Sequence, residues 1–352
     1  MASAATLDAV PGERILDLCA APGGKSTQIA AALGDRGLLV SNDPEPARTQ
    51  ALAGNLERMG AANAVVTCAL PRKLAERWPE HFDAILVDAP CSGEGMFRRD
   101  PAARDEWNPA SPEGCARRQA EILDQAARML RPGGRLVYST CTFNETENEG
   151  SILAFLERHP DFTPEDFRLP GVGQSHSGML RLFPHRLRGD GHFVARLRRR
   201  GDGSPTEAAP SDRPDRALSA YMETLDREVC RLPDAIADMR IIRQGDWLYA
   251  QPRPCPDLRG LRVIRPGLCL ARLGRSHVEP AHALAMAIDP DCARRRFELD
   301  EASARAWLRG EAVPCDGERG WTLALHGGMP LGWGKVSDST LKNHLPKGLR
   351  SH

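Results

Sequence analysis

Several features are missing from the sequence, and each absence excludes a class of protein. No apolar run reaches the roughly 18 residues that a membrane-spanning helix needs. No apolar segment of the kind found in secretion signals follows Met1. No two of the ten cysteines have the CxxC spacing of zinc or redox sites. We therefore expect a reduced, cytoplasmic protein that holds no metal and does not enter a membrane.

Net charge is also absent, because 47 Lys and Arg residues balance 47 Asp and Glu residues. A polyanionic partner such as RNA would have to be met by local basic patches, since the field of the whole molecule offers no attraction.

The length of the chain indicates more than one domain. Its 352 residues exceed what one hydrophobic core usually serves, and a hydrophobic content of 41% is enough to build two domains.

Short apolar runs alternate with helix-period segments from Glu13 onward, which is typical of a sheet with helices on both faces. The runs that we interpret as strands lie at 14–18, 37–42, 64–68, 82–88, 134–140 and 192–198. The helix before the fifth strand begins near Ser111 and is stopped by Pro132, Gly133 and Gly134. Another helix opens at Thr146, with Glu149 completing a capping box. The pattern predicts an α/β fold.

Residues 199–216 contain no apolar side chain larger than alanine apart from proline, so they cannot contribute to a core. We interpret them as a linker between a first domain, residues 1–198, and a C-terminal region, residues 217–352. This second region has mixed strand-like and helical pieces. Its four tryptophans are Trp247, Trp307, Trp321 and Trp333. We expect them to lie in the core rather than to stack on bases.

The segment ILDLCAAPGGKST, residues 15–27, predicts an apolar strand, a glycine turn and a helix that begins near Lys25. Gly23 and Gly24 let the backbone approach a ligand, and the helix N-terminus offers unpaired N–H groups. Asp43 follows the second strand, where a carboxylate can accept hydrogen bonds from ribose hydroxyls. Taken singly, these residues would indicate only a turn and a helix cap. The complete string favours a nucleoside site.

Two cysteines close neighbouring strand ends. The string FDAILVDAPCSGEGMF places Cys91 after the fourth strand, and GRLVYSTCTFNETENEG places Cys141 after the fifth. Because ligands of open α/β sheets bind outside the carboxyl ends of the strands, we expect both thiols, Asp88 and the glycine turn to share one crevice. A single strand-end cysteine is usually structural, but packing does not explain both strings together.

These segments resemble motifs I, IV and VI of the Nop/Sun family of RNA cytosine-C5 methyltransferases, over roughly residues 11–198, and in particular the bacterial RsmF-type 16S rRNA enzymes. The resemblance implies a Rossmann-like S-adenosylmethionine-dependent methyltransferase sheet. DNA cytosine-C5 enzymes use the cysteine of a Pro-Cys pair as nucleophile, which would select Cys91. The family pattern selects Cys141 instead.

The resemblance also implies a role for each site residue. Cys141 attacks C6 of the cytosine, Asp88 holds or protonates N3, and Cys91 assists release of the product. The residues implied in binding S-adenosylmethionine are Cys19, Ala20, Ala21, Pro22, Gly23, Gly24, Lys25, Asp43 and Asp88. Lys25 either orients Asp88 or the substrate, or is merely solvated. Because cytosine C5 and C6 are buried in stacked RNA, the target base must be unpaired or extruded.

Three further features concern contacts with RNA, the adenine of the cofactor and the region ahead of motif I. Arg98, Arg99 and Arg104 follow Cys91 and are placed either to meet phosphates or to form a solvated loop. The family's polar residue after the third strand, which holds the adenine, has no counterpart in the stretch VTCAL, residues 66–70. The family's extension ahead of motif I is also missing here, so we expect either a lost domain or a fragment.

From Gly320, the stretch GWTLALHGGMPLGWGKVSDSTLKNHLPKGLR resembles the C-terminal PUA-like RNA-binding module of RsmF-type enzymes, a smaller α+β domain. A local basic patch is formed by Lys335, Lys342, Lys347 and Arg350, which could track an RNA backbone or simply be solvated. This resemblance favours small-subunit rRNA, or the ribosomal subunit, as the partner of a monomeric enzyme. A tRNA cytosine-C5 methyltransferase and a non-catalytic ribosome-assembly RNA-binding protein stay open as alternatives. A DNA methyltransferase has little support, because no target-recognition domain is apparent.

Overall fold

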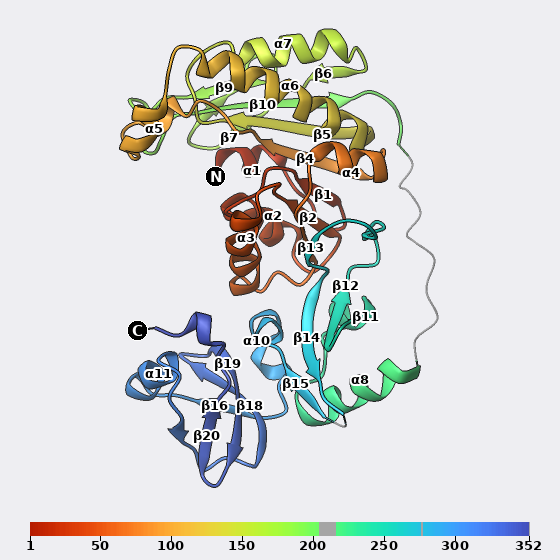
Figure 1. The fold of residues 1–352 in the computed structure, drawn as a ribbon, viewed down its shortest axis with the longest axis vertical. Coiled ribbons are helices and arrows are strands. Elements are labelled where there is room, and N and C mark those ends of the chain that lie inside the picture. Colours follow the sequence, from red (N-terminus) through yellow and green to blue (C-terminus); the bar gives the residue numbers. More distant parts are fainter. Residues whose placement is uncertain (204–215, 276, 352) are drawn as a thin grey trace. The chain divides into compact units, whose positions relative to one another are not determined.

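A computed structural model describes residues 1–203, 216–275 and 277–351 of the chain (Figure 1). They form two compact units: residues 1–53, 65–203 and 254–264 make the first, and residues 54–64, 216–253 and 265–351 the second. Most of the predicted linker, residues 204–215, lies outside the described residues. Within these ranges no helix is long and apolar enough to cross a membrane.

The first unit is built on a nine-stranded sheet in the order β13-β3-β2-β1-β4-β5-β10-β6, with β9 beside β10. The strands are β1 (Arg14–Asp17), β2 (Leu38–Asn42), β3 (Ala64–Thr67), β4 (Phe82–Asp88), β5 (Leu130–Thr140), β6 (Phe162–Pro164), β9 (Met179–Leu182), β10 (His192–Arg199) and β13 (Val263–Arg265). β1 is parallel to β2 and β4, and β4 is parallel to β5. The predicted α/β class is therefore confirmed.

Helices connect these strands and cover the sheet. They are α1 (Ala2–Leu7), α2 (Gly24–Leu33), α3 (Pro46–Arg58), α4 (Pro71–Arg77), α5 (Pro101–Glu106), α6 (Ser111–Met129) and α7 (Glu149–Arg158). In Figure 1, α6 and α7 lie on one face of the sheet around β5, and α1 lies on the other. A short 3-10 helix, η1 (Glu94–Met96), follows β4, and a small hairpin joins β7 (Arg168–Leu169) to β8 (Gly173–Gln174).

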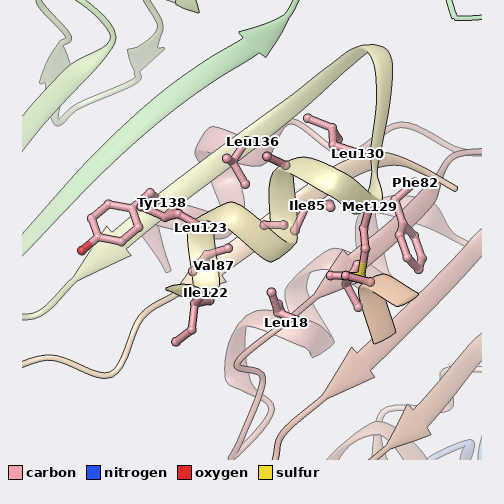
Figure 2. Packing of buried hydrophobic residues seen from close by; sticks show 14 of the residues in the cluster. Leu18, Phe82, Ile85, Val87, Ile122, Leu123, Met129, Leu130, Leu136 and Tyr138 are labelled. Carbon is pink, nitrogen blue, oxygen red and sulfur yellow. The ribbon is translucent and has the colours of Figure 1, made fainter. Parts of the chain in front are cut away.

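The core under α6 holds β4 and β5 in place. Leu123 and Met129 of α6 are completely buried and pack in one cluster with Ile85 and Val87 of β4 and Leu136 of β5 (Figure 2). Each such side chain contributes about 1.5–3 kcal/mol when it is fully buried. The ends of β4 and β5 are therefore anchored by a rigid core, and these ends carry Cys91 and Cys141.

Two predicted element boundaries are wrong. Helix α6 ends at Met129, and Pro132, Gly133 and Gly134 lie inside β5, which starts four residues earlier than predicted and pairs with β4 through a register shift. Helix α7 begins at Glu149 rather than Thr146, and no side chain caps it. The capping box does not form because the Glu149 carboxylate binds the guanidinium of Arg181 instead.

The second unit contains two further sheets. The first has the order β11-β12-β14-β15 and the second the order β16-β18-β19-β20-β17. Their strands are β11 (Arg240–Gln244), β12 (Trp247–Gln251), β14 (Leu268–Leu273), β15 (Val278–Pro280), β16 (Arg296–Glu298), β17 (Val313–Pro314), β18 (Gly320–His326), β19 (Met329–Ser337) and β20 (Thr340–Asn343). The helices are α8 (Arg216–Glu228), α9 (Asp234–Ala237), α10 (His282–Ala287), α11 (Glu301–Leu308) and two 3-10 turns, η2 (Pro290–Cys292) and η3 (Lys347–Leu349).

The tryptophans of this unit do not all behave as predicted. Trp307, Trp321 and Trp333 are buried, as expected. Trp247 is 41% exposed, so its assignment to the core is wrong. It is the first residue of β12, directly after a turn at Gly245, and its side chain points to solvent while that of Leu248 is buried.

Candidate active site

The two strand-end cysteines meet at the carboxyl edge of the first sheet. β4 and β5 are parallel neighbours, with Asp88 opposite Ser139 in the register. Cys91 and Cys141 follow these strand ends, and their Sγ atoms lie 3.2 Å apart as free thiols. The backbone N–H of Cys141 also donates to the Sγ of Cys91 at 3.3 Å. The strand order thus brings together two thiols that are separated by 50 positions in the chain.

Asp88, the last residue of β4, is held from two sides. Lys25 Nζ lies 2.6 Å from Oδ2 of Asp88, and the hydroxyl of Ser139 donates to Oδ1 at 2.6 Å. The side chains of Lys25 and Asp88 are 20% and 27% exposed, so water screens this ion pair less than one on the open surface. The structure therefore places Lys25 on Asp88 rather than in solvent.

The contact between the thiols changes their pKa values in opposite directions. The hydrogen bond with the Cys91 thiol lowers the pKa of Cys141. Burial and the negative charge of Asp88 oppose this effect, and the positive charge of Lys25 lowers the pKa further. The pKa of Cys91 is raised by its hydrogen bond to Cys141 and by burial. A lowered pKa favours the thiolate form, so of the two thiols that of Cys141 ionises more readily.

Two carboxylates connect the loop after β4 to the loop after β5. One carboxylate comes from each loop and accepts hydrogen bonds from the other loop. Glu147 of the second loop is fully buried and accepts a hydrogen bond from the backbone N–H of Ser92 at 3.0 Å. Glu94 of the first loop accepts hydrogen bonds from the backbone N–H groups of Phe143 and Asn144 at 2.9 and 3.1 Å. We call this pair, Glu94 and Glu147, the carboxylate clasp. It joins the segments that carry the two thiols.

Sequence reasoning missed both residues of the clasp, and Ser139 as well. The Glu147 carboxylate also accepts hydrogen bonds from the side-chain amides of Gln119 and Asn144, at 2.7 and 2.8 Å. The only sequence signal was the polar run NETENEG, residues 144–150, in which Thr146 and Glu149 alone were given a role, as a capping box. Hydrogen bonds across such a distance in the chain leave no local spacing to detect.

The glycine turn after β1 has the backbone geometry that a close approach to a ligand requires. Gly23 precedes α2 with a φ of 111°, in the left-handed region that favours glycine. Asp43 braces the turn, because its Oδ2 accepts a hydrogen bond from the backbone N–H of Ala21 at 3.3 Å. Its Oδ1 accepts from the backbone N–H of Glu45 at 3.0 Å, and Arg48 lies 3.5 Å from the carboxylate.

A cavity of about 1240 Å³ opens over these elements. Of the residues that the sequence singles out, it is lined by Cys19, Ala21, Asp43, Asp88, Cys91 and Cys141. Leu70 and Pro71, which follow β3, also line it, and Leu70 is 67% exposed. Ligand pockets usually measure about 300–1,000 Å³, so this cavity has room for a nucleoside and a second base.

The arginines after Cys91 are already engaged within the protein. Arg98 and Arg99 lie 3.7 and 3.4 Å from the carboxylate of Asp190, and Arg104 lies 3.6 Å from Asp105. The side chains of Arg98 and Arg99 are 71% and 72% exposed, so these ion pairs are weak. Both of the predicted alternatives, phosphate contact and a solvated loop, stay open for them.

Comparison with known proteins agrees with this fold. The family model described as 16S rRNA methyltransferase RsmB/F matches residues 4–198. The model of the RsmF rRNA methyltransferase first C-terminal domain matches residues 224–288, and the methyltransferase RsmF PUA domain matches residues 294–351. The predicted PUA-like domain is therefore confirmed, and another matched domain precedes it.

Individual relatives point the same way. The Ribosomal RNA small subunit methyltransferase F of Shigella boydii serotype 18 is 35% identical, over 96% of this chain and 73% of its own length. The protein of that name from Escherichia coli strain SE11 is 34% identical over the same shares. Among solved structures, NSun6 from Pyrococcus horikoshii with SFG is 32% identical with a TM-score of 0.51, covering 57% of this chain and 51% of that one. PH0851 is 34% identical with a TM-score of 0.53, covering 56% and 44%.

The Rossmann-like sheet, the glycine turn and the cavity over the strand ends define a methyltransferase of the S-adenosylmethionine-dependent class. Within that class, the chain belongs to the 16S rRNA methyltransferase RsmB/F family.

Proposed function

We propose that the protein methylates C5 of a cytosine in small-subunit rRNA through a covalent bond between Cys141 and C6 of the base. One observation carries the proposal: two free thiols lie 3.2 Å apart at the cavity that Asp88 also lines, together with Cys19 and Ala21, which precede the glycine turn. A methyltransferase acting on an oxygen or nitrogen atom needs no cysteine nucleophile, since such atoms attack a methyl donor directly. Two juxtaposed thiols fit a reaction that must first activate a carbon atom.

The residues of the cavity fit S-adenosylmethionine. Asp43 lies at the end of β2, where it can accept hydrogen bonds from ribose hydroxyls. Leu70 and Pro71 offer apolar surface for the adenine in place of the polar residue that is missing after β3. Beneath the turn, Asp17 is fully buried, and its Oδ1 has no hydrogen-bond partner among the described residues. Burial raises the pKa of Asp17 to about 7, and Asp17 is not among the residues that line the cavity. The carboxylates of Asp43 and Asp88 do line it, which suits a ligand that carries positive charge.

Cysteine chemistry is required because cytosine C5 is too weak a nucleophile to accept a methyl group directly. The thiolate of Cys141 adds to C6, and the electron pair of the C5–C6 bond moves into the ring. Asp88 holds the edge of the base or delivers a proton to N3, so that negative charge does not accumulate. The ammonium of Lys25, 2.6 Å from Asp88, keeps this carboxylate in place. S-adenosylmethionine, when bound, supplies an electrophilic methyl group for C5.

Release of the product reverses the addition. The C5 proton passes to water, the electron pair of the C5–H bond re-forms the C5–C6 double bond, and Cys141 departs as a thiolate; a proton held on N3 returns to Asp88. Cys91 assists this step, because its thiol can donate a hydrogen bond to the departing sulfur. The raised pKa of Cys91 keeps it protonated and able to donate.

The choice of rRNA rests on the names of the relatives and on the PUA domain match. In this domain the side chains of Lys335, Lys342 and Lys347 are exposed and available to an RNA backbone. A monomeric enzyme that acts in the cytoplasm stays part of the proposal.

The proposal is tested by incubating the protein with labelled S-adenosylmethionine and either 16S rRNA, small ribosomal subunits or tRNA. The RNA is then digested to nucleosides and analysed by mass spectrometry. We expect 5-methylcytidine from 16S rRNA or from the subunit. Label in tRNA alone would overturn the choice of substrate, and a methylated nucleoside other than 5-methylcytidine would overturn the chemistry.

A further inference from the structure

A second hollow of about 470 Å³, outside the cavity described above, is lined by Arg98 and by residues 184–189. We call it the basic pocket. Its charged side chains are Arg98, Arg186 and Arg188, with His185 beside them, and no carboxylate lines it. Within the described ranges of the chain, no carboxylate forms an ion pair with Arg186 or Arg188. Arg98 shares Asp190 with Arg99 at 3.7 Å and is mostly exposed.

The segment that forms this pocket adjoins the backbone of Cys141. The backbone N–H of Gly95 donates to the carbonyl oxygen of Cys141 at 2.8 Å. A Cβ atom placed on Gly95 would lie 2.8 Å from that oxygen and 2.7 Å from the carbonyl oxygen of Gly191. The backbones of Cys141 and Gly191 therefore converge on Gly95, and Gly191 follows the pocket-lining residues almost directly.

Stacked rings lead from the loop of Cys141 to the pocket. Phe143 lies two residues after Cys141 and stacks on Phe183, with ring centroids 5.8 Å apart and planes 19° apart. Phe183 stacks in turn on His185 at 5.3 Å and 30°. His185 is exposed and lines the basic pocket. An exposed ring flanked by arginines suits single-stranded RNA, because bases stack on rings while phosphates pair with guanidinium groups.

We infer that the basic pocket binds the RNA backbone next to the target cytosine, with Arg186 and Arg188 on phosphate groups and His185 beneath a flanking base. This inference rests on the proposed function. On this inference, the first unit binds RNA through its own residues, close to Cys141, in addition to any contact made by the PUA domain. Such contacts position the strand, and the base in the catalytic cavity is read separately.

The test compares the double variant Arg186→Gln/Arg188→Gln with the matched control Arg168→Gln/Arg200→Gln, which removes the same charge from exposed arginines elsewhere in the first unit. Binding of a labelled 16S rRNA transcript is measured by filter retention over a range of salt concentrations. Methyl transfer is measured in parallel. Each lost contact to a single strand should reduce the slope of log K against log salt by about 0.7, so the pocket variant should lose about 1.4.

We expect the pocket variant to bind RNA about tenfold more weakly near 0.1 M salt, with a raised KM for RNA and an unchanged kcat, while the control matches the wild type. A His185→Ala variant should also raise the KM. Equal affinity and equal salt slopes for the pocket variant and the wild type, in an enzyme that still methylates RNA, would overturn the pocket assignment alone. Failure of the wild type to bind or methylate any RNA would overturn the proposed function, and this assignment with it.

Discussion

Glu147 accepts hydrogen bonds from both the backbone N–H and the hydroxyl of Ser92, although the two residues are 55 positions apart. Ser92 is the neighbour of Cys91, and Glu147 lies in the loop that begins at Cys141. The position of one thiol relative to the other therefore depends on a buried carboxylate that reacts with nothing itself. Buried hydrogen-bond networks of this kind hold their members in a single arrangement when every partner is satisfied.

The clasp can be tested with Glu147→Gln. A glutamine amide turns one accepting oxygen into a donor that faces the donors of Ser92, Gln119 or Asn144. We expect this to cost about 1–3 kcal/mol of folding stability. We also expect kcat/KM to fall by about tenfold or more, since each 1.4 kcal/mol lost from the transition state is a factor of ten. Methyl transfer and thermal unfolding measure the two effects.

The matched control is Glu145→Gln, which makes the same chemical change at an exposed position of the same loop. It should behave like the wild type in both assays. If Glu147→Gln retained full activity alongside this control, the clasp would not set the spacing of the thiols.

The pKa difference between the thiols predicts how alkylation of Cys141 depends on pH. Cys91→Ala removes the hydrogen bond that lowers the pKa of Cys141, so the pKa of Cys141 should rise. Because the thiolate reacts, the midpoint of alkylation should move to higher pH. Iodoacetamide labelling of the Cys141 peptide, followed by mass spectrometry in the absence of RNA, measures this midpoint. Cys115→Ala serves as the control and should leave it unchanged, whereas an unshifted midpoint in Cys91→Ala would contradict the account.

Gly95 offers a steric test of the approach of the two loops. A Cβ at this position would meet the carbonyl oxygens of Gly191 and Cys141 at 2.7 and 2.8 Å, and backbone atoms cannot move aside cheaply. We expect Gly95→Ala to reduce kcat at least tenfold through displacement of Cys141. In Gly114→Ala, on α6, the Cβ meets nothing within 4 Å, so this control should keep full activity and gain about 0.5–1 kcal/mol of stability. If Gly95→Ala and Gly114→Ala were equally active, the close contact of Gly95 with Cys141 would not be needed for activity, and this prediction would be wrong.

The strands and the strand-end cysteines could be predicted from the sequence because their signals are local. The apolar run that ends at Asp88 sets the end of β4, and known rules of open sheets place Cys91 and Cys141 at one edge. The start of β5 could not be predicted, because Pro132 and the following glycines usually end an element, whereas here pairing with β4 carries the strand through them.

The remaining features of the site depend on contacts between distant segments. Glu147 has no preference for a buried position, and only the fold brings Ser92 and Gln119 to its carboxylate. The partner of Arg98 and Arg99 is Asp190, 91 positions further along the chain from Arg99. Lys25 was open to two interpretations because its local sequence is the same whether Asp88 lies beside it or not. Such pairings form only in the tertiary structure, so the periodicity of apolar residues in the sequence does not predict them.

The central claim is that Cys141 forms the bond to cytosine and that Cys91 helps to break it. The most direct measurement incubates wild type, Cys141→Ala and Cys91→Ala with labelled S-adenosylmethionine and 16S rRNA, and scores methyl transfer together with protein covalently attached to RNA on denaturing gels. We predict that Cys141→Ala gives neither product, and that Cys91→Ala accumulates the covalent complex. A covalent complex formed by Cys141→Ala but not by Cys91→Ala would contradict the account and make Cys91 the nucleophile.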